Sequence, residues 1–357
     1  MIDFLIVGGG IAGLSAGARL SQHGLVTVLE AEDAPGYHTS GRSAALFEQN
    51  YGPPSVVALS KASAEYLSTE NGGYLTPRGL MLLGTSDQAA VFDADLIDLD
   101  MRAISVDEAI ARVPVLRAET IAYAGRSDKA QDVDTDRLMQ DFARIIRKNG
   151  GAVLTKRPVT QIHKGRHWTV EAQGSFTAHV LVNAAGAWAD QIAGLAGIAP
   201  VGITPYRRSI ARIPAPCGHD VQEWPMMFGA GSAWYAKPDA GKLLVSPFEA
   251  EVVEPHDAYA DDFVLAQGLA RYEAMVTEPV TRVENNWAGL RSFAPDGTLV
   301  LGPDPRDRSF VWCAGQGGYG FQTAPAASRL VADLVCGSTP ALDPDIVACV
   351  SANRLTG

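Results

Sequence analysis

The chain has 357 residues, of which 47 % are hydrophobic and 19 % are charged, and its formal net charge is −11 at pH 7. This length predicts about two domains, and the composition is that of an ordinary globular protein. The negative charge argues against nucleic acid and anionic membrane surfaces as partners, and no apolar stretch approaches the roughly 20 residues that span a bilayer.

The N-terminus and the cysteines bear on where the protein resides. The first predicted strand starts near residue 3, which leaves no charged-then-apolar leader, so a cytoplasmic location is expected. The cysteines show neither close pairing nor metal-ligand spacing and are expected to be reduced thiols in the core: Cys217, Cys313, Cys336 and Cys349. The histidines are scattered, so no metal site is expected.

The opening segment, DFLIVGGGIAGLSAGARLSQHGLVTVLEA, predicts a strand, a turn, a helix and a second strand. The first strand covers 4–7, a helix of small residues runs to about His23, and the second strand covers 26–29. This order is typical of the βαβ unit that binds a dinucleotide.

The turn has the spacing Gly8-x-Gly10-x-x-Gly13. Gly8 permits the tight turn, Gly10 lets backbone N–H groups approach a pyrophosphate, and Gly13 lets the helix pack closely on the strand. The helix N-terminus adds partial positive charge. Glu30, after the second strand, is placed to accept ribose hydroxyls, and a purely structural turn would leave it unexplained.

The segment after Glu30 bears on which dinucleotide binds, because nicotinamide and flavin proteins share the opening motif. It contains Ser40-Gly41-Arg42-Ser43-Ala44-Ala45. Such a turn brings further backbone donors and one guanidinium to a longer cofactor. An ordinary surface turn is the alternative.

An amphipathic helix is predicted in DTDRLMQDFARIIRKNG, with its apolar residues on one stripe: Leu138, Phe142, Ile145 and Ile146. Asp134 or Thr135 caps its start and Asn149-Gly150 ends it. A strand at 152–155 follows, so the parallel sheet is expected to resume there.

The rest of the chain predicts a second domain and a return to the first. A hairpin turns at Gly174, and its second arm, 178–183, leads into Ala184-Ala185-Gly186, where backbone again approaches a cofactor. Short strands interrupted by proline between about 200 and 286, with one helix near 261–276, predict a mostly antiparallel domain. The segment RSFVWCAGQGGYGFQTAPAASRLVADLV then repeats the strand, glycine loop and helix of the opening unit.

Together, the opening motif, GYHTSGRSAA, VDTDRL, LVNAAGAWAD, WAGLRSF and QGGYGFQT resemble the FAD-dependent D-amino acid oxidase and dehydrogenase superfamily, and within it most closely the D-arginine dehydrogenases. The resemblance runs nearly end to end. It implies a non-covalent FAD, because LRSFAPDGTLVLG lacks the cysteine that anchors flavin in sarcosine-oxidase relatives. Besides the residues above, it places these at the cofactor: Ala12, Ala31, Val159, Gly317, Tyr319, Gly320 and Phe321.

The fold class expected is α/β. A discontinuous, Rossmann-like FAD-binding domain with a parallel sheet is predicted from residues 1–74, 132–199 and 287–357. A substrate-binding domain on a mostly antiparallel sheet is predicted from 75–131 and 200–286.

Oxidation of an α-amino acid needs a clamp for the carboxylate, for which guanidinium and hydroxyl donors are suited. The residues that match the family's clamp and substrate border are Arg291, Arg208, Tyr51 and Tyr235. Arg207 is close enough in sequence to be confused with Arg208.

The resemblance also assigns three further positions in the substrate pocket. It implies that the Gly318 carbonyl faces the substrate amine, that Gln322 lies one turn further on and that Met226 forms part of the pocket wall. For Met226, plain core packing is an equal alternative.

The pocket departs from D-arginine dehydrogenases at three positions. Leu80 stands where they carry the glutamate that meets the distal guanidinium, and Leu46 stands where they carry an active-site histidine. An unpaired buried charge costs roughly 3–5 kcal/mol, so a neutral or hydrophobic substrate side chain is expected, although the loss of the histidine could instead slow the chemistry. Glu48 replaces a neutral hydroxyl residue and either restores recognition of a cation or, as we favour, points to solvent.

The leading expectation is oxidative deamination of a D-amino acid, with hydride transfer from Cα to the flavin giving an imino acid. The electron acceptor is open among oxygen, a quinone and a protein. One alternative is oxidation of a secondary amine such as sarcosine or D-proline. Another is a flavin-bound subunit of a multi-subunit amine dehydrogenase, against which the chain shows no cysteine cluster and no long interaction tail.

Overall fold

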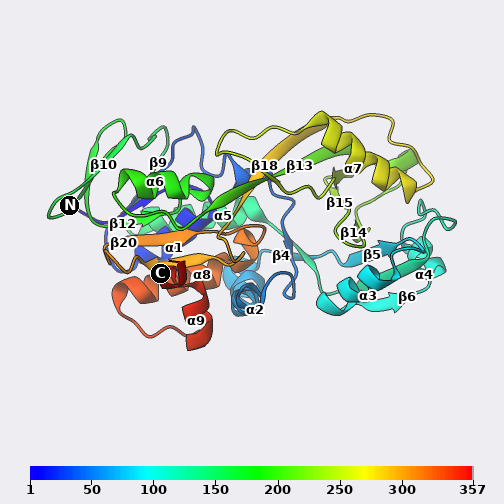
Figure 1. The fold of residues 1–357 in the computed structure, drawn as a ribbon, viewed down its shortest axis with the longest axis horizontal. Coiled ribbons are helices and arrows are strands. Elements are labelled where there is room, and N and C mark those ends of the chain that lie inside the picture. Colours follow the sequence, from blue (N-terminus) through cyan, green and yellow to red (C-terminus); the bar gives the residue numbers. More distant parts are fainter. Residues whose placement is uncertain (356–357) are drawn as a thin grey trace.

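A parallel sheet assembled from three distant parts of the chain forms one half of the molecule (Figure 1). In the computed structural model, which describes residues 1–355, five strands run parallel in the order β9, β2, β1, β12 and β20. Their bounds are Ala152–Leu154, Val26–Leu29, Ile2–Val7, Ser175–Asn183 and Phe310–Ala314. These short apolar runs suit a sheet that is covered on both faces, so the sheet is rebuilt from the N-terminus, the middle and the C-terminus, as the sequence predicts.

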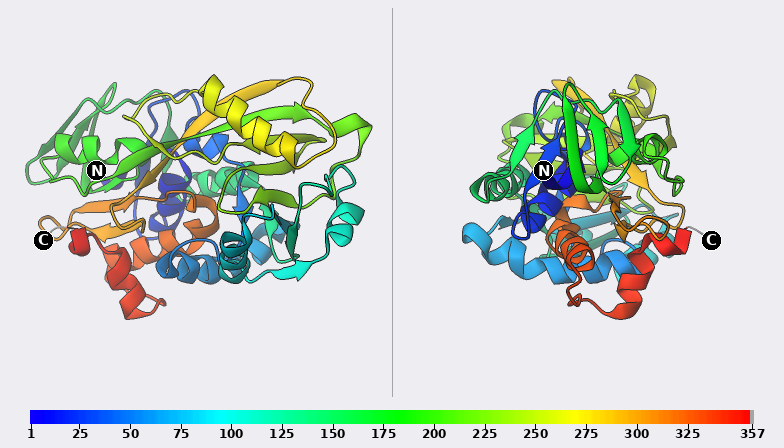
Figure 2. Two further views of the ribbon diagram at one scale, coloured as in Figure 1. Left: turned by 45° about the vertical axis from the view of Figure 1, so that its right-hand side comes forward. Right: turned by 90° about the vertical axis from the view of Figure 1, so that its left-hand side faces the viewer.

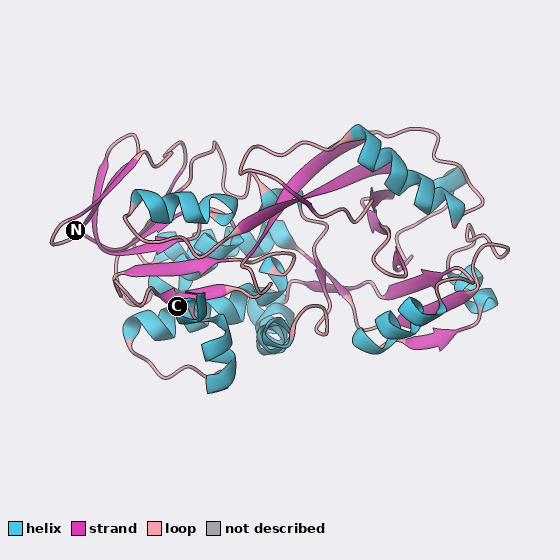
Figure 3. Cartoon of the chain, in the orientation of Figure 1, coloured by secondary structure: helices cyan, strands magenta, loops and turns pink. Residues whose placement is uncertain are grey.

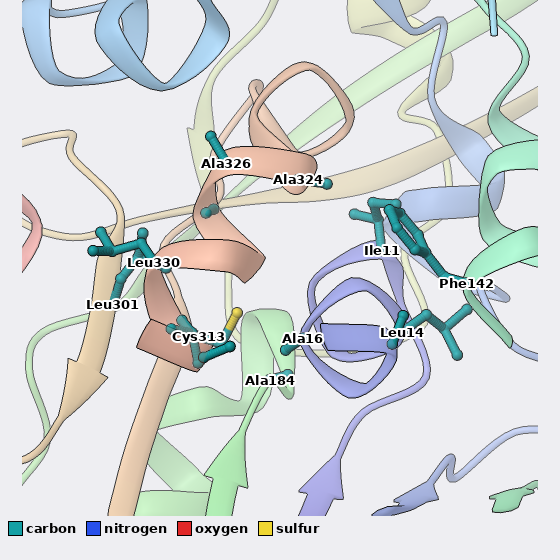
Figure 4. Packing of buried hydrophobic residues seen from close by; sticks show 14 of the residues in the cluster. Ile11, Leu14, Ala16, Phe142, Ala184, Leu301, Cys313, Ala324, Ala326 and Leu330 are labelled. Atoms are coloured by element: carbon teal, nitrogen blue, oxygen red, sulfur yellow. The ribbon is translucent and has the colours of Figure 1, made fainter. Parts of the chain in front are cut away.

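Three helices cover one face of this sheet. They are α1 (Ile11–Leu20), α5 (Thr135–Lys148) and α8 (Gly320–Cys336). Figure 4 shows Leu14 and Ala16 of α1 between Phe142 of α5 and the small side chains of α8. Alanine and glycine along α1 let the helices approach closely, and this packing forms the largest apolar core.

The sequence predicts α5 well, and the structure resolves which of Asp134 and Thr135 caps its start. The helix starts after Asp134, whose carboxylate accepts a hydrogen bond from the backbone N–H of Arg137 at 3.1 Å. Asp134 is therefore the N-cap and Thr135 is the first helical residue. The end of α1 is corrected, because that helix stops at Leu20 and a turn carries the chain through His23.

The predicted hairpin extends the parallel sheet beyond the first half of β12, next to the sheet face opposite α1, α5 and α8. Strand β11 (Trp168–Glu171) pairs with the first half of β12 around Gly174, and β10 (Gln161–Lys164) extends it. Helix α6 (Ala189–Leu195) and the fully buried Trp168 pack on this face. On the same side of β12 as the hairpin, β20 pairs with the second half of β12, and β19 (Val300–Pro303) pairs antiparallel with β20.

A second, mostly antiparallel sheet forms the other half of the molecule, on the right of Figure 3. Eight strands follow the order β17 (Glu251–Val252), β13 (Thr204–Pro214), β16 (Lys242–Ser246), β15 (Tyr235–Asp239), β14 (Met226–Gly229), β5 (Leu80–Gly84), β7 (Tyr123–Ser127) and β6 (Arg102–Ile104). The ninth, β18 (Asn285–Phe293), pairs with β13, and three helices pack against this half: α3 (Ala89–Asp98), α4 (Val106–Arg112) and α7 (Asp262–Ala274).

A small sheet and two helices complete the structure. Strands β3 (Leu46–Phe47), β8 (Gln131–Val133) and β4 (Leu75–Pro77) form a three-stranded sheet where the two halves meet. Helix α2 (Pro54–Thr69) packs beside α8, and α9 (Pro344–Val350) packs on α2 toward the C-terminal end of the chain (Figure 2).

The structure corrects two sequence expectations about organisation. The boundary proposed at residue 287 cuts through β18, which pairs with β13 along its whole length from Asn285 to Phe293. These residues therefore belong to the second sheet, because backbone hydrogen bonds along a strand keep it whole.

All four cysteines are free, but only Cys313 is buried, whereas Cys217, Cys336 and Cys349 are exposed. No helix among residues 1–355 is long and apolar enough to cross a membrane.

Replacing Phe142 by alanine is expected to destabilise the parallel half by about 3–5 kcal/mol, because a fully buried ring at the α1–α5 contact leaves a cavity. Urea unfolding followed by circular dichroism measures this change. The control is Phe263→Ala, since that ring is 72 % exposed and its loss should change the free energy of unfolding by less than about 0.5 kcal/mol. Equal effects of the two substitutions would contradict this view of the core.

Candidate active site

A cavity of about 950 Å³ lies where the two halves of the molecule meet. It is lined by the N-terminus of α1, the loop 39–46, β13, β18 and the loop before α8. The loops at the carboxyl ends of β1, β12 and β20 supply much of the wall, which is where parallel α/β sheets bind ligands.

The first glycines of the chain are required by close backbone contacts. Gly8 has φ +108°, and a Cβ there would lie 2.3 Å from the carbonyl oxygen of Ala184. A Cβ on Gly13 would lie 1.9 Å from the carbonyl oxygen of Gly8. A larger residue at Gly13 would push α1 away from the turn after β1, and one at Gly8 would push away the loop after β12, so these two glycines shape the turn from outside the cavity.

Two helix N-termini open onto the cavity, of which the first N–H of α1, on Ile11, is bonded to the Ser40 hydroxyl. The N-cap residues are Gly10 for α1 and Tyr319 for α8, and neither makes a side-chain capping hydrogen bond. Gly10 and Gly320 both line the cavity. Free N–H groups and the helix dipoles favour an anionic ligand at each end, which fits a dinucleotide.

The structure places most of the predicted cofactor residues on the cavity wall. Those that line it are Gly10, Ala12, Ser40, Arg42, Ser43, Ala44, Ala45, Gly186, Gly317, Tyr319, Gly320 and Phe321. Those that do not line it are Gly8, Gly13, Glu30, Ala31, Gly41, Val159 and Ala185. Glu30 is buried, and its carboxylate accepts hydrogen bonds from the backbone N–H groups of Gly9 at 2.7 Å and Glu32 at 2.9 Å.

Two side chains, Ser40 and Arg42, fix the loop 40–45. Arg42 does so through contacts that the sequence did not predict. The Ser40 hydroxyl accepts a hydrogen bond from the Ile11 backbone N–H at 3.0 Å, which ties the loop to α1. The guanidinium of Arg42, expected at the cofactor, instead donates to the carbonyl oxygens of Ala258 and Ala288 and pairs with Asp257. It reaches these acceptors because β18 of the other half lies directly beside the loop.

Two arginines from adjacent strands line the part of the cavity wall formed by β13 and β18. In the β13–β18 register, Tyr206 lies opposite Arg291 and Arg208 lies opposite Gly289. Arg208 and Arg291 are thus diagonal neighbours on one face of the sheet. Both line the cavity, and the Phe248 ring lies 4.2 Å from the Arg208 guanidinium carbon and 5.9 Å from that of Arg291.

Neither guanidinium forms an ion pair with a carboxylate in the part of the chain that the structure describes. Arg208 donates from Nε to the carbonyl oxygen of Glu249 at 2.7 Å, and Arg291 reaches the Tyr51 hydroxyl at 3.5 Å. Burial, followed by the charge of Arg291, lowers the pKa of Arg208 to about 10, so it still carries its proton at neutral pH. The Glu249 carboxyl lies near enough to act on Arg208 electrostatically but bonds to the Ser209 N–H instead, so two close cations without an ion-pair partner form a site for an anion.

Strand alternation distinguishes Arg208 from its neighbour Arg207. Arg207 points to the opposite face of β13, where it pairs with Glu251 and Asp261. The sequence left these two residues open to confusion. The structure selects Arg208, because successive side chains of a strand point to opposite faces.

The other predicted clamp and amine residues surround the arginine pair. Tyr51 and Tyr235 both line the cavity. Gly318 lies so close to Arg291 that a Cβ there would be 3.0 Å from the guanidinium carbon. Gln322, in the first turn of α8, donates to the carbonyl oxygen of Tyr51 at 3.2 Å.

The predicted apolar wall is present, and two aromatic residues extend it. Leu46, Leu80 and Met226 line the cavity, and Met226 pairs with Leu80 in the β14–β5 register. Phe228 and Phe248 also line it and were not predicted. No motif marks Phe248, whose positive φ of 60° is visible only in the folded backbone.

Glu48 does not point to solvent, which corrects the orientation that the sequence favoured. Its side chain is only 4 % exposed, and the residue lines the cavity. The turn from Glu48 to Tyr51 folds the side chain inward, with the Tyr51 N–H donating to the Glu48 carbonyl oxygen at 3.2 Å. Burial raises the pKa of the Glu48 carboxyl above its usual value.

The parallel sheet, its glycine-rich turn and the arginine-bearing antiparallel sheet together define an FAD-dependent oxidoreductase. The chain belongs to the DAO family of FAD dependent oxidoreductases, whose family model matches residues 3–334. FAD is the cofactor of this family, and the cavity wall offers the uncapped helix ends and backbone approach that FAD requires. No cysteine or histidine among residues 1–355 lines the cavity, and non-covalent binding of FAD stays a prediction.

Several known proteins are similar to this chain over nearly its whole length. FAD-dependent oxidoreductase domain-containing protein 1 of Bos taurus is 27 % identical over 93 % of this chain and 81 % of its own length. Glycine oxidase of Pseudomonas putida is 26 % identical over 95 % and 96 %. The crystal structure of glycine oxidase from Geobacillus kaustophilus superposes with a TM-score of 0.83, covering 99 % of both chains at 23 % identity. L-proline dehydrogenase from P. horikoshii gives a TM-score of 0.82, covering 99 % and 97 % at 22 % identity. These comparisons confirm the superfamily, whereas the closer resemblance to D-arginine dehydrogenases stays a prediction.

A buried lysine connects the loop 40–45 to the substrate sheet. Lys237, two residues after Tyr235 on β15, is 8 % exposed. Its Nζ donates to the carbonyl oxygens of Ala44 at 2.5 Å and Ala45 at 3.0 Å, and it pairs with Asp132 at 2.9 Å. The strand that carries Tyr235 thereby also fixes two residues of the cofactor wall.

Replacing Lys237 by methionine is expected to weaken FAD binding by about 10- to 100-fold, because charged hydrogen bonds of roughly 1.5–3 kcal/mol hold the loop. Titration of the apoprotein with FAD, followed by flavin fluorescence, measures the dissociation constant. Lys242→Met, which removes a partly exposed pair with Glu284, is the matched control. Equal FAD affinity in the two variants would show that Lys237 does not position the loop.

Proposed function

We propose that this protein oxidises an α-amino acid, with a preference for the D-enantiomer, to the corresponding imino acid. FAD, when bound, accepts the hydride from the substrate Cα. The observation that carries the proposal is the pair of buried guanidinium groups, Arg208 and Arg291, which line the cavity without a carboxylate partner among the described residues. An α-carboxylate would supply the missing negative charge.

The residues around the pair have separate tasks in this proposal. Arg208 and Arg291 hold the carboxylate, and the hydroxyls of Tyr51 and Tyr235 border it. The Gly318 carbonyl accepts a hydrogen bond from the substrate amine. With both groups fixed, Cα is held in one orientation, and such positioning alone lowers a reaction barrier by several kcal/mol.

The wall next to the clamp favours an apolar substrate stem. Leu46, Leu80 and Met226 offer no hydrogen-bonding side-chain group of appreciable strength, so a polar stem would lose its hydration there without compensation. This part of the wall supports the expectation of a neutral or hydrophobic side chain next to Cα. The stereochemical preference rests on the resemblance of the site motifs to D-amino acid enzymes.

Oxidation of a secondary amine such as sarcosine or D-proline is the second candidate. It is favoured by the similarity of the fold to a protein named L-proline dehydrogenase, and the same carboxylate clamp would serve it.

A role as the flavin-bound subunit of a larger amine dehydrogenase predicts that the isolated chain does not turn over and elutes with partners on gel filtration. The cytoplasmic location and the electron acceptor also belong to the proposal, and reoxidation by air, a quinone or a protein acceptor tests the latter.

Anaerobic mixing of the holoenzyme with D-alanine, D-methionine and D-norleucine is expected to bleach the visible absorbance of the oxidised flavin. The L-enantiomers are expected to react more slowly, and sarcosine and proline test the second candidate. A flavin that stays oxidised with every amino acid and amine in this panel would refute the proposed class of reaction.

Replacing Arg291 by glutamine is expected to lower kcat/KM for the best amino acid by about 100- to 1000-fold, since a buried charged hydrogen-bond partner of the carboxylate is lost, at a cost of roughly 3–4 kcal/mol. Arg207→Gln, one residue from Arg208 but on the opposite face of β13, should change kcat/KM by less than about threefold. Stopped-flow reduction measures both values. A larger effect of Arg207→Gln would reassign the clamp.

A further inference from the structure

The cavity contains a second charged group that the carboxylate clamp does not use. Glu48 Oε1 accepts a hydrogen bond from the Asn50 backbone N–H at 3.1 Å. Oε2 is screened from water and has no hydrogen-bond partner within residues 1–355. An ionised carboxylate in this position costs several kcal/mol unless a cation pairs with it.

The backbone of Glu48 is held in place, so its side chain stays at the cavity. Its N–H donates to the Gln322 side-chain oxygen at 3.4 Å, and its carbonyl oxygen accepts from the Tyr51 N–H at 3.2 Å. The same short turn therefore carries Tyr51 toward Arg291 and Glu48 toward another part of the wall.

Different charged groups act on Glu48 and on the arginine pair. The charges that act on Glu48 are those of Lys129 and Asp100, which are exposed surface residues that pair with each other. The groups that act on Arg208 are Arg291, Tyr235, Tyr51 and Glu249. The cavity thus carries a pair of guanidinium groups on the β13–β18 sheet and a buried carboxyl at Glu48, which forms no ion pair with either arginine among the described residues.

Other residues of the same cavity bear on what Glu48 could bind. Asp98, at the end of α3, is an exposed carboxylate on the rim of the same cavity. Lys129 is 63 % exposed and already paired with Asp100, so it does not neutralise Glu48 directly. Leu99 and Met226 line the cavity as well, so an aliphatic chain could pass along an apolar wall toward the carboxyl.

We propose that Glu48 is a specificity residue that binds a positively charged group at the far end of the substrate side chain. The favoured substrate class is then an α-amino acid whose apolar stem ends in an ammonium group. The free oxygen turns toward the cavity when the cation arrives, and the ion pair replaces the unpartnered carboxyl. This inference rests on the proposed function and narrows it, because the stem stays apolar while its end is charged.

Binding of unreactive acids tests the inference without turnover. The probes are 4-aminobutanoate, 5-aminopentanoate and 6-aminohexanoate, each compared with the unsubstituted acid of the same length, and isothermal titration of the holoenzyme gives the dissociation constants. At least one amino acid of the series is expected to bind about 10- to 100-fold more tightly than its neutral counterpart, as expected for a charged hydrogen bond. Glu48→Gln is expected to abolish this difference while binding of the unsubstituted acids stays within threefold, which also shows that the variant is folded.

Asp98→Asn is the matched control, because it removes a carboxylate from the rim and should preserve most of the difference. The inference is overturned if the wild-type protein shows no preference, if Glu48→Gln retains it, or if Asp98→Asn abolishes it equally. Flavin reduction by D-ornithine and D-lysine against D-norleucine then provides the kinetic comparison, with the same loss expected in Glu48→Gln. Failure of the whole panel to reduce the flavin would refute the proposed function, whereas the binding difference would still decide the role of Glu48.

Discussion

The close approach of two like-charged guanidinium groups is the constraint on which the proposed chemistry depends. Arg208 and Arg291 repel each other, yet continuous pairing of β13 with β18 holds them as diagonal neighbours on one face of the sheet. Hydrogen bonds along nine residues of β18 fix their spacing, and the Phe248 ring beside both guanidinium groups offsets part of the unfavourable interaction. Because the folded protein already bears this repulsion, a carboxylate that binds between the two guanidinium groups relieves it and binds with a more favourable free energy.

Hydrogen bonds connect the loop 40–45 on the cofactor wall with the strands that carry the arginine and tyrosine side chains. Lys237 joins the substrate strand β15 to the carbonyl oxygens of the loop 40–45, and Arg42 joins that loop to the carbonyl oxygen of Ala288 on β18. These are buried or half-buried charged contacts, which are stronger than surface ion pairs because less water competes for them. The position of the clamp relative to the cofactor wall is therefore set by both halves of the molecule together.

Local sequence determined much of the fold and part of the site. The glycine spacing at 8, 10 and 13, the apolar runs of β1 and β2, and the single apolar stripe of α5 are short-range signals that dictate local conformation. Family motifs then located the residues that line the cavity, including both arginines and the two tyrosines. Such signals succeed because backbone sterics and helical periodicity depend on neighbouring residues only.

Tertiary structure alone decided the orientation of several side chains and the limits of the second sheet. The guanidinium of Arg42 is directed by Asp257 and Ala258, which lie more than 200 residues away in the chain. The backbone of Glu48 is likewise held by the distant Gln322, whereas its carboxyl bonds only to the nearby Asn50 N–H. Likewise, β18 joined the antiparallel sheet through its pairing with β13. The sequence states which groups are present, whereas the direction of a charged side chain depends on which distant atoms offer it hydrogen bonds and exclude water.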